Sequence, residues 1–539
     1  MKAYKRDEII KAISDPETTW DIIIVGGGAT GLGTALDAVA RGYKTLLLEQ
    51  SDFAKGTSSR STKLVHGGVR YLAQGDIGLV REALHERGLL LKNAPHLVKN
   101  GSFIIPNYEW WSGAFYTIGL TLYDILAGKL SFGKARYISR KEVINRLPNI
   151  NPKGLFSGVV YHDGQFDDAR LAVNLAQTSL EKGATILNYF RVENLIKNDQ
   201  KEICGVVTTD SETGFSYQIK GRTVINATGV FVDELLQMDI PGKKPIVRPS
   251  QGIHIVIDKS FMPGTDAIMI PKTEDGRVLF AVPWHDKLVV GTTDTPINEH
   301  SLEPRALEEE IDFILRTAEK YLAKTPTRKD VLSIFAGLRP LAAPKGESSK
   351  TKEISRSHKL FVSESGLITI TGGKWTTYRK MGEDTVDKAI EVGKLPPHSS
   401  VTKDLPIHGS LKDLSRNDHL RVYGSDLDEL LALMNENAAW SEKIDPRMPY
   451  LCAEVVWSVR HEMARNLDDI LARRLRALFL DARIAIDMTA KVASLMAREL
   501  GKDKSWETDQ IKSFTLLANG YLLESYYPKT KPSKVKTHE

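Results

Sequence analysis

Three glycines near the N-terminus have the spacing of a dinucleotide-binding turn. The apolar run Ile22–Val25 leads directly into "GGGATG", which fits G-x-G-x-x-G. Gly26 would permit the tight bend, Gly28 would let backbone approach a pyrophosphate, and Gly31 would let helix and strand pack closely. Glu49 follows about 20 residues after the turn, where an acid accepts ribose hydroxyl protons. The pattern predicts a bound ADP-containing dinucleotide, and the alternative is a glycine-rich turn without a ligand.

A second stretch that could do chemistry is "STKLVHGGVRYL", which covers residues 61–72. It mixes hydroxyls, a lysine, a histidine, a glycine pair, an arginine and a tyrosine around apolar Leu64 and Val65. Hydroxyls and amides that follow a nucleotide-binding strand suit pyrophosphate and ribityl contacts. The residues expected to make those contacts are Ser58, Ser59, Ser61, Thr62 and Lys63.

Length and composition limit the class of protein. The chain has 539 residues, which is too long for one core and predicts two or three domains. A net charge of +5 is too weak to indicate nucleic-acid binding, but it fits an anionic substrate or a weak attraction to anionic lipid. Cys204 and Cys452 form no CxxC pair, so we expect no disulfide framework, no metal site and a reducing compartment. We also expect no secretory signal and no spanning helix.

Further nucleotide-type strands are scattered along the chain. "RTVINATG" at residues 222–229 and "LITITGGKWTTYRKM" from Leu367 each read as a strand that enters a turn of small residues. A nucleotide domain spread this widely must be interrupted by a second domain. The glycine motif fits both NAD and FAD, and this layout favours a two-domain flavoprotein over a compact NAD dehydrogenase.

Together the motifs resemble one family. "IIIVGGGATGLGTALDA", "GTSSRSTKLVHGGVRYL", "GQFDDARL", "VINATG", "QGIHIVI", "GLRPL" and "TGGKWTTYRKM" are similar to the aerobic FAD-dependent glycerol-3-phosphate dehydrogenases, which are D-amino-acid-oxidase-like flavoproteins. The resemblance covers roughly residues 20 to 390. "AEVVWSVRHEMARNLDDILARRLRALFLD" looks like the helical C-terminal domain of that family, though it is less diagnostic.

The resemblance implies a mixed α/β and α+β fold in three parts. A Rossmann-like FAD-binding domain of the glutathione-reductase type would be interleaved with an antiparallel-sheet substrate domain, and an α-helical domain would follow. We expect the FAD-binding domain at 20–100, 155–240 and 330–395, the substrate domain at 101–154 and 241–329, a linker at 396–410, the helical domain at 411–525 and a basic tail at 526–539.

The cofactor implied by the resemblance is noncovalent FAD. His66 is interpreted as a structural or flavin-edge residue, because nothing in the sequence demands covalent attachment. Backbone N–H groups of the turn at residues 372–374 would stabilise negative charge on the reduced flavin, unless that turn serves packing alone. The expected cofactor-binding residues are Gly26, Gly28, Gly31, Glu49, Ser58, Ser59, Thr62, Lys63, His66, Gly67, Ala227, Gly229, Gly337, Gly372, Gly373 and Thr376.

The substrate implied by the resemblance is glycerol 3-phosphate, whose phosphate needs cationic donors in a partly dry pocket. The expected substrate-binding residues are Arg70, Tyr71, Arg356 and Lys374. Taken singly, each arginine is more often a surface ion-pair partner. Arg339 lies between apolar "IFAG" and "PLAAP", so we expect it to be buried beside an anion or a flavin carbonyl.

Two residues are expected to be catalytic. The resemblance places His254, in "QGIHIVI", near the substrate, where a neutral imidazole can accept the hydroxyl proton. The alternative is a hydrogen-bonded core histidine. Arg339 would stabilise developing negative charge on the substrate oxygen.

The expected activity is oxidation of sn-glycerol 3-phosphate to dihydroxyacetone phosphate, with electrons passed to a membrane quinone. The alternatives are a peroxide-forming oxidase, an amino-acid or hydroxy-acid oxidase of the same fold, and a non-enzymatic nucleotide-binding module. We expect a cytoplasmic enzyme bound peripherally to the inner face of the cytoplasmic membrane, and the oligomeric state is open, with a homodimer as one alternative. Trp110–Tyr123 and the basic C-terminal region are the candidate membrane contacts. A buried core helix is the alternative for the Trp110–Tyr123 segment.

Overall fold

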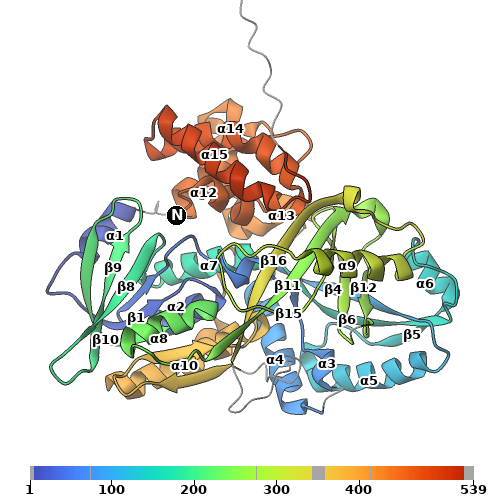
Figure 1. Cartoon of the computed structure of the whole chain (residues 1–539), viewed down its shortest axis with the longest axis horizontal. Helices are drawn as coiled ribbons and strands as arrows, with labels where there is room; N and C mark the ends of the chain where they lie inside the picture. Colours follow the sequence, from blue (N-terminus) through green and yellow to red (C-terminus); the bar gives the residue numbers. More distant parts are fainter. Residues whose placement is uncertain (1–4, 73–74, 275, 343–357, 413–414, 527–539) are drawn as a thin grey trace, which may run out of the picture.

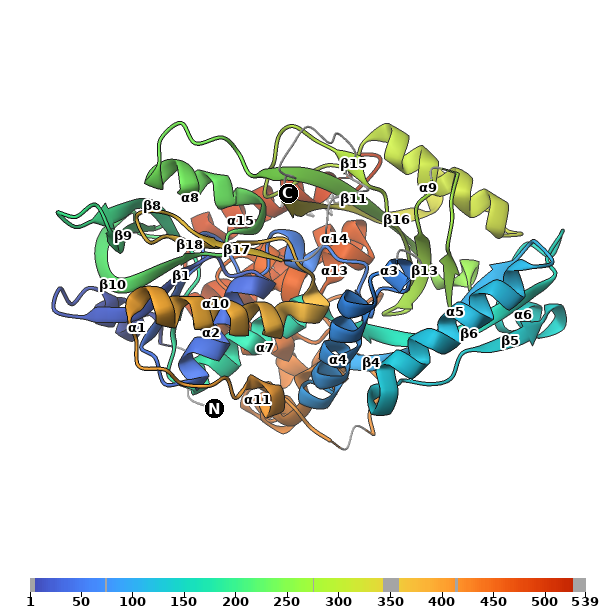
Figure 2. The ribbon, with the colours of Figure 1, turned by 90° about the horizontal axis from the view of Figure 1, so that it is seen from below.

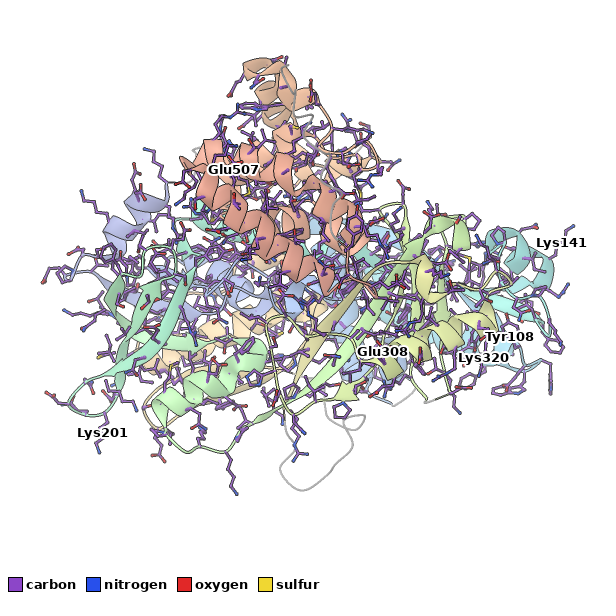
Figure 3. All side chains as sticks on the ribbon, turned by 45° about the horizontal axis from the view of Figure 1, so that its top comes forward. Tyr108, Lys141, Lys201, Glu308, Lys320 and Glu507 are labelled. Atoms are coloured by element: carbon purple, nitrogen blue, oxygen red, sulfur yellow. The ribbon has the colours of Figure 1, made fainter. Side chains whose placement is uncertain are left out.

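The computed structural model describes residues 5–72, 75–274, 276–342, 358–412 and 415–526, without the side chains of residues 70, 71, 129 and 342. Two sheets lie end to end along the long axis, and a helical body covers one side of both (Figure 1). Lys201 and Lys141 mark the opposite ends of this axis, while Glu507 lies on the helical body (Figure 3). The predicted fold class is confirmed.

The first sheet combines four parallel pairings with an antiparallel extension, in the part of the chain that is described. Its order is β17-β18-β10-β1-β2-β7, and β9 and β8 extend it from β10. The pairs β1–β10, β1–β2, β2–β7 and β10–β18 are parallel. The strands are β1 (Thr19–Val25), β2 (Thr45–Leu48), β7 (Thr185–Leu187), β8 (Phe190–Lys197), β9 (Ile203–Asp210), β10 (Ser216–Asn226), β17 (Lys359–Val362) and β18 (Ile368–Thr371).

Helices cover both faces of this sheet because its central strand is apolar on both sides. Ile22 and Ile24 of β1 pack into one buried cluster, together with helices α2, α7 and α10. Ile23 and Val25 point to the other face and pack with helices α1 and α8. The helices are α2 (Ala29–Ala40), α7 (Asp168–Glu181) and α10 (Tyr378–Gly393) on one face, and α1 (Arg6–Ile13) and α8 (Val232–Asp239) on the other. The glycine turn therefore joins the buried end of β1, Ile22–Val25, to a largely buried helix.

The second sheet is mainly antiparallel, with one parallel pair, β4–β12, among the described pairings. Its order is β15-β11-β14-β13-β12-β4-β6-β3, with β16 on β11 and β5 on β6. The strands are β3 (Leu64–Val65), β4 (Val98–Asn107), β5 (Arg136–Ser139), β6 (Ser157–Phe166), β11 (Val247–Asp258), β12 (Ala267–Ile270), β13 (Leu279–Trp284), β14 (Lys287–Gly291), β15 (Thr295–Pro296) and β16 (Val331–Ala342). The flanking helices are α3 (Val69–Leu72), α4 (Ile77–Asn93), α5 (Ser112–Ala127), α6 (Arg140–Arg146) and α9 (Glu308–Tyr321).

Three strands pair differently from what the expected boundaries imply. β3, β6 and β16 come from segments assigned to the FAD-binding domain, yet they pair within the second sheet. β3 and β16 pair with strands that lie far away in sequence, β6 and β11, which local patterns do not reveal. The domain boundaries themselves stay a prediction, and the expected tail lies outside the described residues beyond Tyr526.

The helical body shares its core with the first sheet. Its apolar side chains belong to the same buried cluster as those of β1 and α2. Buried ion pairs also join them, because Arg474 pairs with Asp52 after β2, and Arg170 of α7 pairs with Glu462. The helices are α11 (Leu427–Glu436), α12 (Cys452–His461), the π-helical turn Asp469–Arg474, α13 (Ala477–Leu480), α14 (Ala482–Leu500) and α15 (Lys504–Asn519). Within the described part, no helix is both long enough and apolar enough to cross a membrane.

Candidate active site

A cavity of about 440 Å³ is lined by both sheets. The first sheet contributes residues at the carboxyl ends of β1, β2, β10 and β18, and the second contributes residues of β11, β13 and β16. Ligands of parallel α/β sheets bind at the carboxyl ends of their strands, so this is the expected place for a nucleotide.

The glycine turn at the cavity has no room for side chains. Gly26 has a φ of +110°, and a Cβ on it would lie 2.7 Å from the Ala227 carbonyl oxygen. A Cβ on Gly31 would lie 1.8 Å from the Gly26 carbonyl oxygen. Gly28 lines the cavity just before α2 begins, so the helix N-terminus opens toward it. This cradle fits a pyrophosphate, as the sequence pattern predicts.

Glu49 is held beside this cradle. One carboxylate oxygen accepts the Gly27 N–H at 2.6 Å and the other accepts the Ser51 N–H at 2.9 Å. Burial raises the pKa of Glu49, while these two hydrogen bonds act in the opposite direction. Each oxygen keeps a lone pair for a further donor. The residue therefore fits the two hydroxyls of a ribose.

The hydroxyl segment, residues 58–63, lines the cavity with only some of its side chains, and the sequence does not show which. Ser58 lines the cavity, and its hydroxyl accepts the Ala29 N–H at 2.9 Å. Lys63 and Ser59 are not among the lining residues. The Lys63 ammonium is buried and donates to the Ser59 carbonyl at 2.6 Å and to both oxygens of Asp168 at 2.8 Å. Asp168 therefore holds the Lys63 charge outside the cavity lining, and the expected cofactor contact of Lys63 stays a prediction.

The residues after β3 also differ in whether they line the cavity. His66 lines the cavity, and its N–H donates to the Thr376 hydroxyl at 3.2 Å. Gly67 is absent from the lining, because its N–H donates to the Tyr123 hydroxyl at 2.7 Å and a Cβ on it would clash with Leu84 at 2.5 Å. Gly67 thus serves packing against α4 and α5, where a cofactor contact was expected.

The small-residue turns after β10 and β18 complete the nucleotide side of the cavity. Gly372 and Gly373 have φ values of +79° and +75°, which favour glycine. The Trp375 indole N–H donates to the Ser58 carbonyl at 2.8 Å and ties this turn to the hydroxyl segment. The expected residues that line this side are Ala227, Gly229, Gly337, Gly372, Gly373, Lys374 and Thr376.

His254 reaches the cavity from β11, on the second sheet. Its side chain is 2% exposed, and its Nε2 lies 2.9 Å from the Thr62 hydroxyl oxygen. Its ring stacks on Phe335 with centroids 4.9 Å apart. Burial, and then the nearby charges of Arg339 and Lys63, lower the pKa of His254 well below its usual value. The imidazole is therefore neutral at pH 7.

Arg339 lies on β16, beside β11. Its Nη2 donates to the Thr292 hydroxyl and to the Thr293 carbonyl, both at 2.9 Å, and its Nη1 lies 3.5 Å from Asp294. The expected anionic partner is therefore present as a carboxylate. A Cβ on Gly252 would lie 2.3 Å from Arg339 Nη2, so this glycine leaves space for the guanidinium.

The remaining expected substrate residues are only partly described. The backbone of Arg70 and Tyr71 belongs to α3, whose first residue, Val69, lines the cavity. The side chains of Arg70 and Tyr71 are outside the described set. Arg356 also lies outside the described residues. Lys374 lines the same cavity as Arg339.

Sequence reasoning missed three residues at this site. Asp168 holds the hydroxyl segment, Arg277 lines the cavity, and Gly291 leaves room for His254. A glycine inside a strand marks a close approach, so Gly291 carried a readable signal. Asp168 lies in the motif "GQFDDARL", but the motif did not show its role, because its partners lie about a hundred residues earlier in the chain.

Comparisons with known proteins agree with this geometry. A model of FAD dependent oxidoreductases matches residues 21–379, and a model of the C-terminal domain of alpha-glycerophosphate oxidase matches residues 369–507. The mitochondrial glycerol-3-phosphate dehydrogenase of Schizosaccharomyces pombe is 36% identical, over 94% of this chain and 88% of that protein. This chain belongs to the FAD-dependent glycerol-3-phosphate dehydrogenase family. The resemblance carried by its motifs is confirmed.

Two further relatives support the same conclusion. The mitochondrial glycerol-3-phosphate dehydrogenase of Arabidopsis thaliana is 39% identical over 94% of this chain and 86% of that protein. The solved glycerol-3-phosphate dehydrogenase of Bacillus halodurans, complexed with FAD, is 30% identical with a TM-score of 0.80 and covers 97% of this chain and 99% of that one. FAD is therefore the cofactor, in accord with the cradle at Gly26 and the acid Glu49.

Proposed function

We propose that the protein oxidises sn-glycerol 3-phosphate to dihydroxyacetone phosphate and passes the electrons to a membrane quinone. The observation that carries this proposal is the placement of a neutral histidine and an arginine, on the paired strands β11 and β16, in the cavity of the glycine turn. FAD, when bound, accepts the hydride from the alcohol carbon.

His254 is the proposed base. Its lowered pKa keeps the imidazole uncharged at pH 7, and because Nδ1 is fully buried, the hydroxyl proton of the alcohol would be accepted at Nε2, beside Thr62. Burial at the cavity wall also restricts competing water. Thr62 and Phe335 hold the ring in one orientation.

Arg339 is the proposed electrostatic partner. Its guanidinium is fixed by Thr292 and Thr293, so its charge needs no reorganisation when negative charge develops on a substrate oxygen. Lys374 lines the same cavity and adds a second cation. Two cations suit a phosphate dianion better than a neutral polyol. Arg70, Tyr71 and Arg356 remain proposed substrate contacts.

A quinone acceptor requires contact with a lipid surface, and α5 supplies a candidate for it. Trp110, Ile118 and Ile125 are 80%, 73% and 68% exposed, which is unusual for large apolar side chains. Trp111, Phe115 and Leu122 are also exposed at helical spacing with them. The interpretation of this segment as a buried core helix is thus wrong for its outer face. The helix lies along one side of the second sheet, away from the helical body (Figures 1 and 2).

We place this surface on a membrane, because a stripe of this kind is typical of helices that lie in the lipid interface. The proposed location is the inner face of the cytoplasmic membrane.

The experiment that tests this function is an acceptor comparison. Purified enzyme with glycerol 3-phosphate should reduce a quinone faster than it produces peroxide from oxygen. Faster peroxide formation would assign the protein to oxidases instead.

A further inference from the structure

A single hydroxyl holds the proposed base from the cofactor side of the cavity. Thr62 lies between the 3₁₀ turn Thr57–Ser59 and β3, and its hydroxyl oxygen is 2.9 Å from His254 Nε2. The two residues come from segments almost two hundred positions apart. Thr62 was expected to contact the cofactor, but its hydroxyl meets the imidazole.

The remaining contacts of the imidazole are apolar or steric. One ring face stacks on Phe335 with an interplanar angle of 15°. A Cβ on Gly291 of β14 would lie 2.4 Å from His254 Cδ2, so the absence of a side chain there lets the ring sit against the strand. Nδ1 has no hydrogen-bond partner among the described residues. Within that part of the chain, Thr62 alone fixes the hydrogen bonding of the ring.

Both neighbours of Thr62 are anchored to one buried carboxylate. Asp168 accepts the Ser61 N–H at 3.2 Å and the Ser61 hydroxyl at 2.7 Å. Asp168 also receives the Lys63 ammonium at 2.8 Å. Lys63 has a φ of +64°, a left-handed conformation that side chains other than glycine seldom adopt. The ion pair therefore holds a turn that places the Thr62 hydroxyl.

We propose that Thr62 is a positioning residue of the reaction, which sets the orientation of the His254 ring. This rests on the proposed function, in which the alcohol gives a hydride to FAD and its hydroxyl proton to His254 while the carbonyl forms. A hydroxyl can donate to Nε2 or accept from it, so the contact fixes the position of Nε2 in either tautomer of the neutral ring. The Lys63–Asp168 pair acts one step further away, by holding Thr62.

The test compares Thr62→Val, which keeps the shape and removes the hydroxyl, with Thr62→Ser, which keeps the hydroxyl. The rate of flavin reduction by glycerol 3-phosphate should fall about 10- to 100-fold in Thr62→Val, as for other residues that orient a reactive group through a hydrogen bond. Thr62→Ser should stay within about threefold of the wild type. Both variants should retain FAD.

A second readout does not depend on activity. The ¹⁵N resonances of the His254 side chain, assigned by their loss in His254→Asn, report the hydrogen bonding of its ring nitrogens in the resting protein. They should shift in Thr62→Val and return in Thr62→Ser. A merely structural role of Thr62 would leave them in place.

Three outcomes would overturn the proposal. One is a Thr62→Val enzyme with wild-type rate and resonances, and another is an equal loss in both variants. The third is loss of FAD from Thr62→Val, which would make the hydroxyl a cofactor contact. If glycerol 3-phosphate fails to reduce the wild-type flavin, the proposed function fails, while the resonances still decide whether Thr62 orients His254.

Discussion

At the scale of single residues, the site depends on glycines, which leave space, as much as on the functional side chains that fill this space. Gly252 and Gly291 leave the spaces that Arg339 and His254 fill. Both glycines lie in or at the end of strands, where glycine otherwise weakens a sheet. Their placement indicates that close approach of the two functional side chains outweighs that cost.

Gly291→Ala should therefore slow flavin reduction without loss of FAD. The added methyl group would displace the His254 ring, because its Cβ would lie 2.4 Å from Cδ2. Displacement of a positioned base costs about tenfold or more in rate. Stopped-flow measurement of flavin reduction checks this. Gly119→Ala is the matched control, since nothing lies within 4 Å of a Cβ there. Equal rates in the two variants would contradict the steric account.

The nucleotide residues were predictable because their geometry is local. A strand, three glycines and an acid within about thirty residues define the cradle. The contacts of Lys63 and Gly67 could not be read from the sequence, because their partners, Asp168 and Tyr123, lie far away in sequence. A motif can show that a lysine belongs to a family pattern, but it does not show which way the ammonium points.

At the scale of elements, buried ion pairs join the helical body to the first sheet. Arg170 of α7 donates two hydrogen bonds of 2.7 Å to Glu462, at the end of α12, and both side chains are fully buried. Neither end of this bridge is visible in a hydrophobic pattern, so sequence periodicity predicted the helices without predicting how they dock.

Arg170→Met should destabilise the protein by about 3–5 kcal/mol, because it leaves the Glu462 carboxylate buried without its partner. Replacing both residues with Met should recover much of the loss. Denaturant unfolding provides the measurement, and Arg416→Met in the exposed pair with Asp418 is the control, expected to change stability by less than about 1 kcal/mol. A loss in the double variant as large as in Arg170→Met would refute the explanation.

His408 forms a second bridge, whose contribution to the stability of the fold depends on pH. It lies 2.6 Å from Asp426 and 2.7 Å from Glu181. Burial opposes its charge, but the hydrogen bonds to these carboxylates outweigh burial and raise the pKa of His408 to about 9. Its ordinary pKa is about 6.5. The charged bridge therefore stabilises the folded state fully below pH 6.5 and loses its contribution as pH rises to 9.

His408→Gln should lower the thermal midpoint most below pH 6.5, and the gap to the wild type should narrow between pH 6.5 and 9. The full effect corresponds to about 3 kcal/mol. Thermal unfolding at several pH values measures it, with exposed His85→Gln as the control. A gap that stays constant across this range would show that His408 contributes through packing alone.

At the scale of the whole molecule, the apolar stripe and the helical body lie on different sides. Figure 1 shows α5 along the lower edge and α15 in the upper body. The sequence predicted an apolar segment at Trp110–Tyr123, but only the structure separates its buried inner residues from its exposed outer ones. Tyr123 is fully buried while Ile118 is 73% exposed.

The triple variant Trp110→Ser, Ile118→Ser and Ile125→Ser should bind vesicles at least about tenfold more weakly, because three large apolar side chains no longer enter the lipid interface. Cosedimentation with vesicles measures the partition. Leu516→Ser is the matched control, since Leu516 is 75% exposed on α15. Unchanged binding of the triple variant would remove α5 as the membrane surface.

The central claim is that the cavity recognises the phosphate of glycerol 3-phosphate beside FAD. In the proposed function, Arg339 and Lys374, which both line the cavity, supply cations for that anion, and a neutral polyol would not use them. Stopped-flow bleaching of the flavin by glycerol 3-phosphate and by glycerol tests this most directly. The account predicts rapid bleaching by the phosphate ester and little by glycerol, and it predicts that Arg339→Lys loses much of the difference, because a point charge cannot copy a planar fork. Equal rates with the two alcohols in the wild-type enzyme would contradict it.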